Sequence, residues 1–159
     1  MTKQELISRV IARLEAELAM LTQAALATHA EATDEENKAE DKYDTRGLEA
    51  SYLAHGQSKA AEEAALAVAQ FTALPVREFK PVEPISLGAL VTLESRDQTT
   101  HYLIGPRAGG TEVTVGDRTV LVITPHSPLG RQLMGRRQGD VLMTNLGGKS
   151  GQQHVALVS

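Results

Sequence analysis

The chain has 159 residues and a formal net charge of −4, a length that suits one ordinary domain or two small ones. The absence of cysteine excludes disulfides and thiolate metal sites. No apolar run approaches membrane-spanning length, the first residues lack the layout of a signal peptide, and a mildly acidic balance does not favour independent nucleic-acid binding. We therefore expect a cytoplasmic protein that makes no membrane contact.

Composition and charge differ between the two halves of the chain. Residues 1–74 carry a net charge of −6, are rich in Ala, Leu and Glu, and contain no proline. Residues 75–159 carry a net charge of +2 and are rich in Gly, Pro, Val and Thr. This contrast is typical of a helical module joined to a β-rich one, and it predicts an α+β protein.

Two long helices are predicted in the first half. From residue 2 to about residue 30 the apolar residues recur with a period of 3.5, the pattern of a coiled-coil seam, at Ile7, Ile11, Leu14, Leu18, Leu21 and Ala25. A matching seam from about residue 45 to residue 73 consists of Ala50, Ala54, Gln57, Ala61, Ala64, Val68 and Phe71. The matched lengths favour an antiparallel hairpin within one monomeric chain, and an intermolecular coiled coil is the alternative.

The segment that joins these helices, residues 31–44, is strongly acidic. Its fourteen residues include seven acids and two bases. In a hairpin these carboxylates lie at the far tip, from which they could deliver oxygen ligands to another macromolecule. The simpler interpretation is that they make the tip soluble and cap a helix N-terminus, with Thr33 or Asp34 as the capping residue.

The second half begins with a proline-rich stretch, residues 75–84, that we expect to be an extended linker. Beyond it, residues 85–159 contain six short β-branched or alternating runs separated by glycine turns, at 89–94, 100–104, 112–115, 119–124, 141–145 and 154–158. One short helix is predicted after Ser127, because Ser127 suits an N-cap, Pro128 suits the first helical position and Gly135 suits the end. We therefore expect a small antiparallel sheet with one helix before its last two strands.

Three ordered motifs in this half resemble those of the Gre family of bacterial transcription elongation (transcript-cleavage) factors. Residues 127–140, SPLGRQLMGRRQGD, resemble the family's Ser-Pro-Leu/Ile-Gly/Ala-Arg-x-Leu-Leu/Ile-Gly-Lys-x-x-Gly-Asp segment. Residues 87–93, LGALVTL, are similar to its Gly-Ala-x-Val-x-Val strand, and residues 102–106, YLIGP, to its Tyr-x-Ile/Leu-Val/Ile-Gly turn. The resemblance covers residues 85–159, and the first half matches in architecture and approximate length.

The acidic tip departs from the family pattern Asp-x-x-Glu-Asn-x-Glu-Tyr. Aligning Glu36 and Asn37 with Glu-Asn places Thr33 at the Asp position, whereas aligning Tyr43 with Tyr places Glu36 there and Ala39 at the Glu position. Glu36 falls on an acidic position in both alignments. The candidate catalytic acids, which would act in the polymerase active site, are Asp34, Glu35, Glu36 and Asp41.

The resemblance implies an FKBP-like second domain that docks at the rim of the secondary channel of RNA polymerase while the hairpin enters the channel. The tip acids, chiefly Glu36 and Asp34, would then help to hold a Mg²⁺ ion of the polymerase, which hydrolyses its own backtracked RNA. The candidate docking residues are Ser127, Pro128, Leu129, Gly130 and Arg131. Lys38, Lys42 and Arg46 could contact the RNA 3′ end, or they are simply solvated charges. The chain would bind no cofactor alone and would not itself be an enzyme.

Three other functions compete with this interpretation, and the residues argue against two of them. A Gre-like protein with a displaced tip pattern could bind the channel and regulate or inhibit polymerase without stimulating cleavage. A peptidyl-prolyl isomerase needs an aromatic pocket, yet the second half offers only Phe79 and Tyr102. A freestanding hydrolase needs a nucleophile beside a base, and no such group accompanies the carboxylates. The five histidines also lack the spacing of metal ligands; they are His29, His55, His101, His126 and His154.

Overall fold

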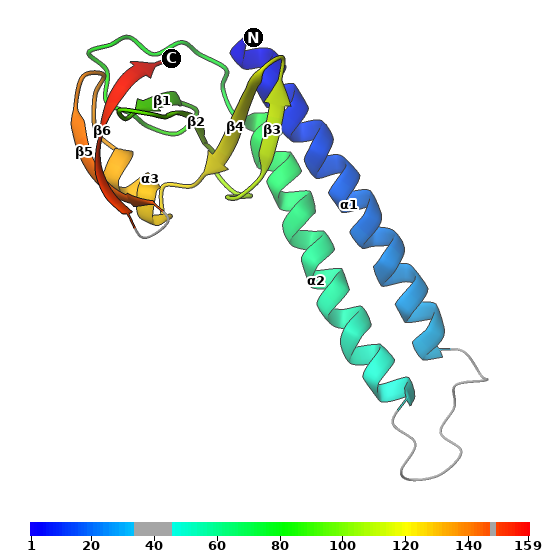
Figure 1. The fold of residues 1–159 in the computed structure, drawn as a ribbon. Coiled ribbons are helices and arrows are strands. Elements are labelled where there is room, and N and C mark those ends of the chain that lie inside the picture. The colour runs from blue at the N-terminus through cyan, green and yellow to red at the C-terminus, as the bar shows by residue number, and fades with distance from the viewer. Residues whose placement is uncertain (34–45, 147–148) are drawn as a thin grey trace. The chain divides into compact units, whose positions relative to one another are not determined.

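The computed structural model spans residues 1–159 and describes residues 1–33, 46–146 and 149–159 (Figure 1). Two long helices, α1 (Lys3–Thr33) and α2 (Arg46–Ala73), come first in the chain. Six strands and one short helix follow in the order β1 (Leu90–Glu94), β2 (Thr99–Ile104), β3 (Glu112–Val115), β4 (Arg118–Ile123), α3 (Pro128–Leu133), β5 (Val141–Leu146) and β6 (Lys149–Val158). The α+β class and the order of elements predicted from the sequence are confirmed.

The chain divides into two compact units whose limits do not follow the change in composition. The helical unit is Ala12–Ala69, and the sheet unit joins Met1–Ile11 to Gln70–Ser159. The first turns of α1 and the last turn of α2 therefore pack with the sheet. The sequence places a boundary at residue 74 because composition reports the secondary structure that a segment prefers, and not the core in which it is buried.

In the helical unit α1 and α2 run side by side and antiparallel (Figure 1). At roughly 1.5 Å per residue they extend about 46 Å and 42 Å. The predicted seam of α1 faces away from solvent, since Ile7, Leu14 and Ala25 are buried and Ile11, Leu18 and Leu21 are half-buried. On α2 the alanines Ala54, Ala64 and Ala67 are buried.

The six strands form one sheet in the order β3-β4-β2-β1-β6-β5. All neighbours pair antiparallel except β2 and β4, which are parallel with His101 opposite Val120. The sequence gives no sign of this parallel pair, because β4 reaches β2 only after the chain has crossed to β3 at the edge. The last strand is also longer than expected. Its polar first half, Lys149–Gln153, has little strand propensity of its own and is held by pairing with β5.

Both faces of the sheet carry buried residues, but one of them is exposed at β5 and β6, where Met143 is 68% and Leu157 48% exposed. One face carries the main core, to which α3 contributes Leu133 and the stretch 75–89 contributes Phe79, Ile85 and Ala89. On the other face the ring of Phe71, from the last turn of α2, lies against Gly105 and Val122. A Cβ at Gly105 would lie 2.6 Å from Cζ of Phe71, so only glycine permits this contact. This packing fixes the end of α2 on the sheet.

The proline-rich stretch 75–84 contains no helix or strand, as expected, but it is packed and not a free linker. Phe79 is 5% exposed in the main core. Lys3 Nζ and Arg77 Cζ lie 4.8 Å and 3.7 Å from the centroid of the Phe79 ring. A turn closes the stretch, with the Glu83 N–H donating to the Lys80 carbonyl over 2.9 Å. Prolines predict that a helix stops, whereas the burial of one aromatic side chain determines that the segment stays attached.

Candidate functional site

The docking residues predicted from the sequence form the start of α3. Ser127 has an extended backbone, with φ −65° and ψ 156°, and caps the helix. Its Oγ accepts a hydrogen bond from the Gly130 N–H at 3.0 Å and donates one to the Thr124 carbonyl at 2.8 Å. Pro128 occupies the first helical position, where a missing N–H removes no helical bond. The capped start predicted from the sequence is confirmed.

Gly130 is required by close packing within this turn. A Cβ at this position would lie 1.8 Å from the Thr124 carbonyl oxygen and 2.8 Å from Ser127 Oγ. Both atoms belong to the cap itself, so no side chain can be accommodated without opening the cap. The Gly/Ala position of the sequence motif is therefore restricted here to glycine by the backbone of residue 124.

The other end of α3 is also fixed. Gly135 adopts φ +81°, a conformation that favours glycine, and its N–H donates to the Ile85 carbonyl at 2.9 Å. In return the Ile85 N–H donates to the Arg136 carbonyl at 2.7 Å. Leu133 is fully buried, Leu129 is half-buried against the core, and Pro128 and Arg131 are exposed. The motif is thus a rigid turn that presents an exposed proline and arginine.

A groove continues from this turn along the chain that precedes it. It has a volume of about 470 Å³ and is largely apolar, with walls from four separate segments, namely Gln70, Ala73, Leu74, Pro75, Leu87, Pro106, Pro125 and His126. Sequence reasoning missed it, because its residues come from the end of α2 and three loops. The one signal in the sequence is Leu87, a large apolar residue directly before the motif glycine Gly88. In the structure Leu87 is 42% exposed.

Three arginines, Arg131, Arg136 and Arg137, lie on α3 or directly after it. Arg131 and Arg136 are exposed. Arg137 has a structural role, since its Nε donates to the Val82 carbonyl at 2.9 Å and its backbone N–H donates to Asp140 Oδ2 at 2.8 Å. The exposed side of α3 and the residues after it therefore carry positive charge.

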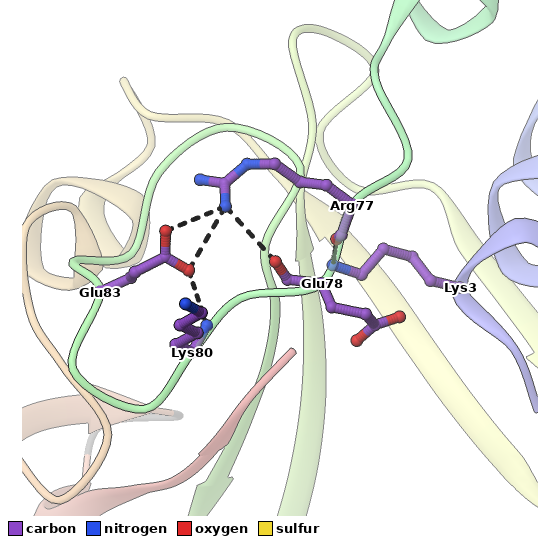
Figure 2. Close-up of polar contacts among 5 residues, drawn as sticks. All are labelled: Lys3, Arg77, Glu78, Lys80 and Glu83. Carbon is purple, nitrogen blue, oxygen red and sulfur yellow. Dashed lines mark hydrogen bonds and ion pairs between the residues drawn. The ribbon is translucent and has the colours of Figure 1, made fainter.

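A cluster of charged side chains links the start of α1 to the proline-rich stretch (Figure 2). Lys3, only 6% exposed, donates from Nζ to the Arg77 carbonyl, and Arg77 Nη1 lies 3.3 Å from Glu83 Oε1. Burial lowers the pKa of Lys3, the nearby Glu78 raises it and Arg77 lowers it further. The Lys80 N–H lowers the pKa of Glu83 by donating to its carboxylate, an effect that Arg77 reinforces. This cluster was not predicted, because its members are far apart in the sequence.

The predicted acidic and RNA-contacting residues are not placed by the structure. Asp34, Glu35, Glu36, Lys38, Asp41 and Lys42 lie outside the described residues. Arg46 begins α2, but its side chain lies outside the described part. Among the residues that are described, no group of three or more His, Asp or Glu side chains could hold a metal ion. The candidate metal ligands therefore stay a prediction from the sequence.

The histidines lie on the surface or in strands, as predicted. His101 on β2 contacts Thr92 Oγ1 through Nδ1 at 3.0 Å, and burial together with Arg118 lowers its pKa, while Asp117 opposes this effect. His154 Nε2 on β6 lies 3.4 Å from Glu94 Oε2. His29, His55 and His126 are exposed.

No protein-family model matches the chain, and no curated protein matches it in sequence. Solved structures match over most of its length. The transcription factor Gfh1 is 22% identical over 97% of this chain and 91% of its own, with a TM-score of 0.41. GreA factor homolog 1 of Thermus thermophilus is 19% identical over 94% of each chain, with a TM-score of 0.39.

The transcription elongation factor GreA/GreB from Nitrosomonas europaea is 17% identical over 70% of this chain and 92% of its own, with a TM-score of 0.35. The resemblance to the Gre family therefore rests on the sequence motifs, because matches with TM-scores below 0.5 carry no argument. At these identities and TM-scores the matches say nothing about activity. Among the described residues, no helix is long and apolar enough to cross a membrane.

Proposed function

We propose that this protein binds bacterial RNA polymerase at the rim of the secondary channel and acts as a transcription elongation factor. The observation that carries the proposal is the segment 127–140. Its sequence resembles the Gre motif almost residue by residue, and it folds as an exposed turn fixed at both ends. A surface held this rigidly loses little conformational entropy on binding, which suits a docking site.

In this proposal α1 and α2 enter the channel, and the acidic segment between them stimulates cleavage of backtracked RNA. Carboxylate oxygens are the ligands that Mg²⁺ prefers, and seven acids in residues 31–44 provide a suitable donor set. Glu36 and Asp34 would contribute ligands to a Mg²⁺ ion of the polymerase, with Glu35 and Asp41 as further acids. The ion would supply Lewis-acid activation of the phosphodiester. The hydrolytic chemistry belongs to the polymerase, so the protein acts as a cofactor in the cytoplasm and is not an enzyme itself.

A second function is favoured by one specific observation. The acidic tip matches the family pattern in neither alignment, because Thr33 or Ala39 replaces an expected acid. A protein with intact docking residues and a displaced tip would occupy the channel without positioning the metal ion. It would then regulate or inhibit the polymerase and would not stimulate cleavage.

The test is RNA cleavage in a backtracked elongation complex at limiting Mg²⁺, with and without the protein. Faster cleavage supports a transcript-cleavage factor, and no acceleration combined with competition against an authentic cleavage factor supports the channel-binding regulator. If the protein neither accelerates cleavage nor competes, the proposed function is wrong. Glu36→Ala should abolish acceleration and leave polymerase affinity nearly intact, whereas Glu62→Ala, an exposed acid on α2, should change neither.

The docking surface is tested separately by polymerase affinity. Pro128→Ala and Leu129→Asp should weaken binding about tenfold or more, because each alters the exposed turn or its support. Pro81→Ala is the matched control, since Pro81 is an exposed proline in a different turn. If the Pro128→Ala and Pro81→Ala variants bind polymerase equally well, the docking surface lies elsewhere on the protein. Circular dichroism of each variant separates lost binding from lost folding.

A further inference from the structure

A cavity of about 580 Å³ lies on the sheet where β2, β4 and β3 run side by side. The side chains that alternate toward it along these strands are Thr100, Tyr102, Thr119, Leu121 and Glu112. All of them belong to the sheet unit. The cavity shares no lining residue with the groove beside α3, and its volume lies in the range of small-molecule sites.

Three of these side chains form a row across the strands. Tyr102 on β2 is opposite Leu121 on β4, and Leu121 is opposite Glu112 on β3. Neighbouring strands are about 4.8 Å apart, so the backbones at Tyr102 and Glu112 are separated by roughly 10 Å. The row therefore presents a phenol at one end, a carboxylate at the other and an apolar side chain between them.

The hydroxyl of Tyr102 is held in the wall of this cavity without a protein partner. The residue is only 6% exposed, yet no described residue forms a hydrogen bond with its hydroxyl, which stays accessible from the cavity. Thr100 lines the same wall, and its Oγ1 is enclosed and also has no hydrogen-bond partner. Buried polar groups are usually paired, so two unpaired hydroxyls at one cavity indicate a polar ligand.

The acids at the cavity favour a ligand of positive charge. Of the five side chains that alternate toward it, only Glu112 is charged, and it is exposed. Asp117 also borders the cavity and is exposed. Carboxylates only accept hydrogen bonds when ionised, whereas an ammonium group only donates them. An anionic ligand would be repelled by the same two acids.

Two basic residues that border the cavity lie on the opposite face of the sheet. Arg118 alternates with Thr119 along β4, and His101 alternates with Tyr102 along β2. The contact of His101 Nδ1 with Thr92 Oγ1, at 3.0 Å, agrees with this placement. The charge that faces the cavity from the three strands is therefore negative.

We propose that this cavity binds a small aliphatic amine. Its ammonium group pairs with the Glu112 carboxylate, its methylene stem lies over Leu121, and its far end donates a hydrogen bond to the Tyr102 hydroxyl. A stem of four carbons places two nitrogen atoms about 6 Å apart, because it spans five bonds of about 1.5 Å in a staggered chain. This length fits between side chains that extend toward each other from backbones roughly 10 Å apart.

The binding is expected to be weak. Because Glu112 is exposed, water screens its ion pair, and we expect a dissociation constant of about 1 mM. The inference does not depend on the proposed function. The cavity shares no residue with the segment 127–140, and the free protein is sufficient for the test.

Titration of the full chain with 1,4-diaminobutane, from about 0.05 to 20 mM at constant ionic strength, tests the inference by NMR. The backbone amide signals of Tyr102, Glu112 and Leu121 should shift and saturate. The matched control ligand is 1,4-butanediol, which has the same stem without charge and should leave these signals in place. Equal shifts with both compounds, or shifts confined to the acidic segment 31–44, overturn the inference.

Two variants separate binding from folding. Glu112→Gln should weaken diamine binding at least about fivefold, whereas Glu15→Gln, at an exposed acid on α1, should leave it unchanged. Tyr102→Phe should weaken binding about threefold and leave the urea midpoint of unfolding unchanged, because its hydroxyl has no described partner to lose. A lower midpoint for Tyr102→Phe would assign that hydroxyl to the fold and, like unchanged binding by Glu112→Gln, would overturn the inference.

Discussion

The two units of this molecule bury their residues in different ways. The sheet unit contains most of the fully buried large side chains, including Phe71, Leu93 and Leu103. The helical unit has mainly alanine in its buried positions, and large apolar residues such as Met20 and Leu26 are 74% and 63% exposed. Burial of a large side chain stabilises a fold by about 1.5–3 kcal/mol, whereas alanine contributes little. The sheet unit is therefore stabilised by packing, and the helical unit depends more on helix propensity.

This difference suits the proposed function. A docking surface must keep one geometry, which a packed core and a doubly fixed turn provide. A pair of helices that enters another macromolecule needs length and a narrow cross-section more than a large core of its own. The comparison predicts that similar substitutions have large effects in the sheet unit and small or opposite effects in the helical unit.

The largest effect is expected for Phe71→Ala. This ring is fully buried against Gly105 and Val122, so its removal should lower the free energy of unfolding by about 3–5 kcal/mol. Leu66→Ala on the same helix should cost less than about 1 kcal/mol, because Leu66 is 40% exposed. Urea denaturation measures both. Similar losses in the two variants would contradict the contrast between the units.

A pair of glycine-to-alanine substitutions should have effects of opposite sign. Gly130→Ala brings a Cβ within 1.8 Å of the Thr124 carbonyl and should destabilise the protein by about 3 kcal/mol. Gly56→Ala meets nothing within 4 Å in the middle of α2 and should stabilise the protein by up to about 1 kcal/mol. Thermal unfolding of the two variants gives the signs directly. Stabilisation by Gly130→Ala would mean that the cap of α3 is not as tight as described.

Removal of its N-terminal cap should destabilise the protein more at the short helix α3 than at the long helix α1. Ser127→Ala deletes both hydrogen bonds of the α3 cap and should cost about 1–2 kcal/mol. Thr2 caps α1, where its Oγ1 accepts a bond from the exposed Glu5 N–H at 3.1 Å, and Thr2→Ala should cost about 0.5 kcal/mol. Chemical denaturation provides the comparison, and Ser127→Thr, which keeps a hydroxyl that can both donate and accept, should restore most of the loss. If both substitutions lower the free energy of unfolding equally, the hydrogen bonds of the α3 cap contribute no more than that of the α1 cap.

The smallest effect concerns the pH dependence of the Lys3 cluster. Burial lowers the pKa of Lys3 in the folded protein, so between that value and the ordinary value of 10.5 the unfolded chain binds more protons than the folded one. The contribution of Lys3 to stability should therefore increase as pH rises through this window. The comparison of urea unfolding of wild type and Lys3→Met, from neutral pH to pH about 10.5, isolates this contribution. Parallel pH curves for the two proteins would show that Lys3 titrates normally.

The sequence by itself determined the element types and the family resemblance. Helical periodicity without proline identified α1 and α2, turn glycines separated the strands, and Ser127, Pro128 and Gly135 located α3 to within a residue. These signals are local, since a cap, a turn or an apolar period is set by residues a few positions apart. The capped turn at Ser127 could be predicted for the same reason.

Only the tertiary structure decided how distant segments combine. The parallel pairing of β2 with β4, the burial of Phe79 from the proline-rich stretch and the position of Lys3 beside Arg77 all join residues far apart in the chain. The steric need for glycine at 130 also depends on the carbonyl of Thr124, and the row of Tyr102, Leu121 and Glu112 depends on the strand order. Such features arise because the burial of a segment depends on residues far from it in the chain. A local sequence pattern contains no information about those residues.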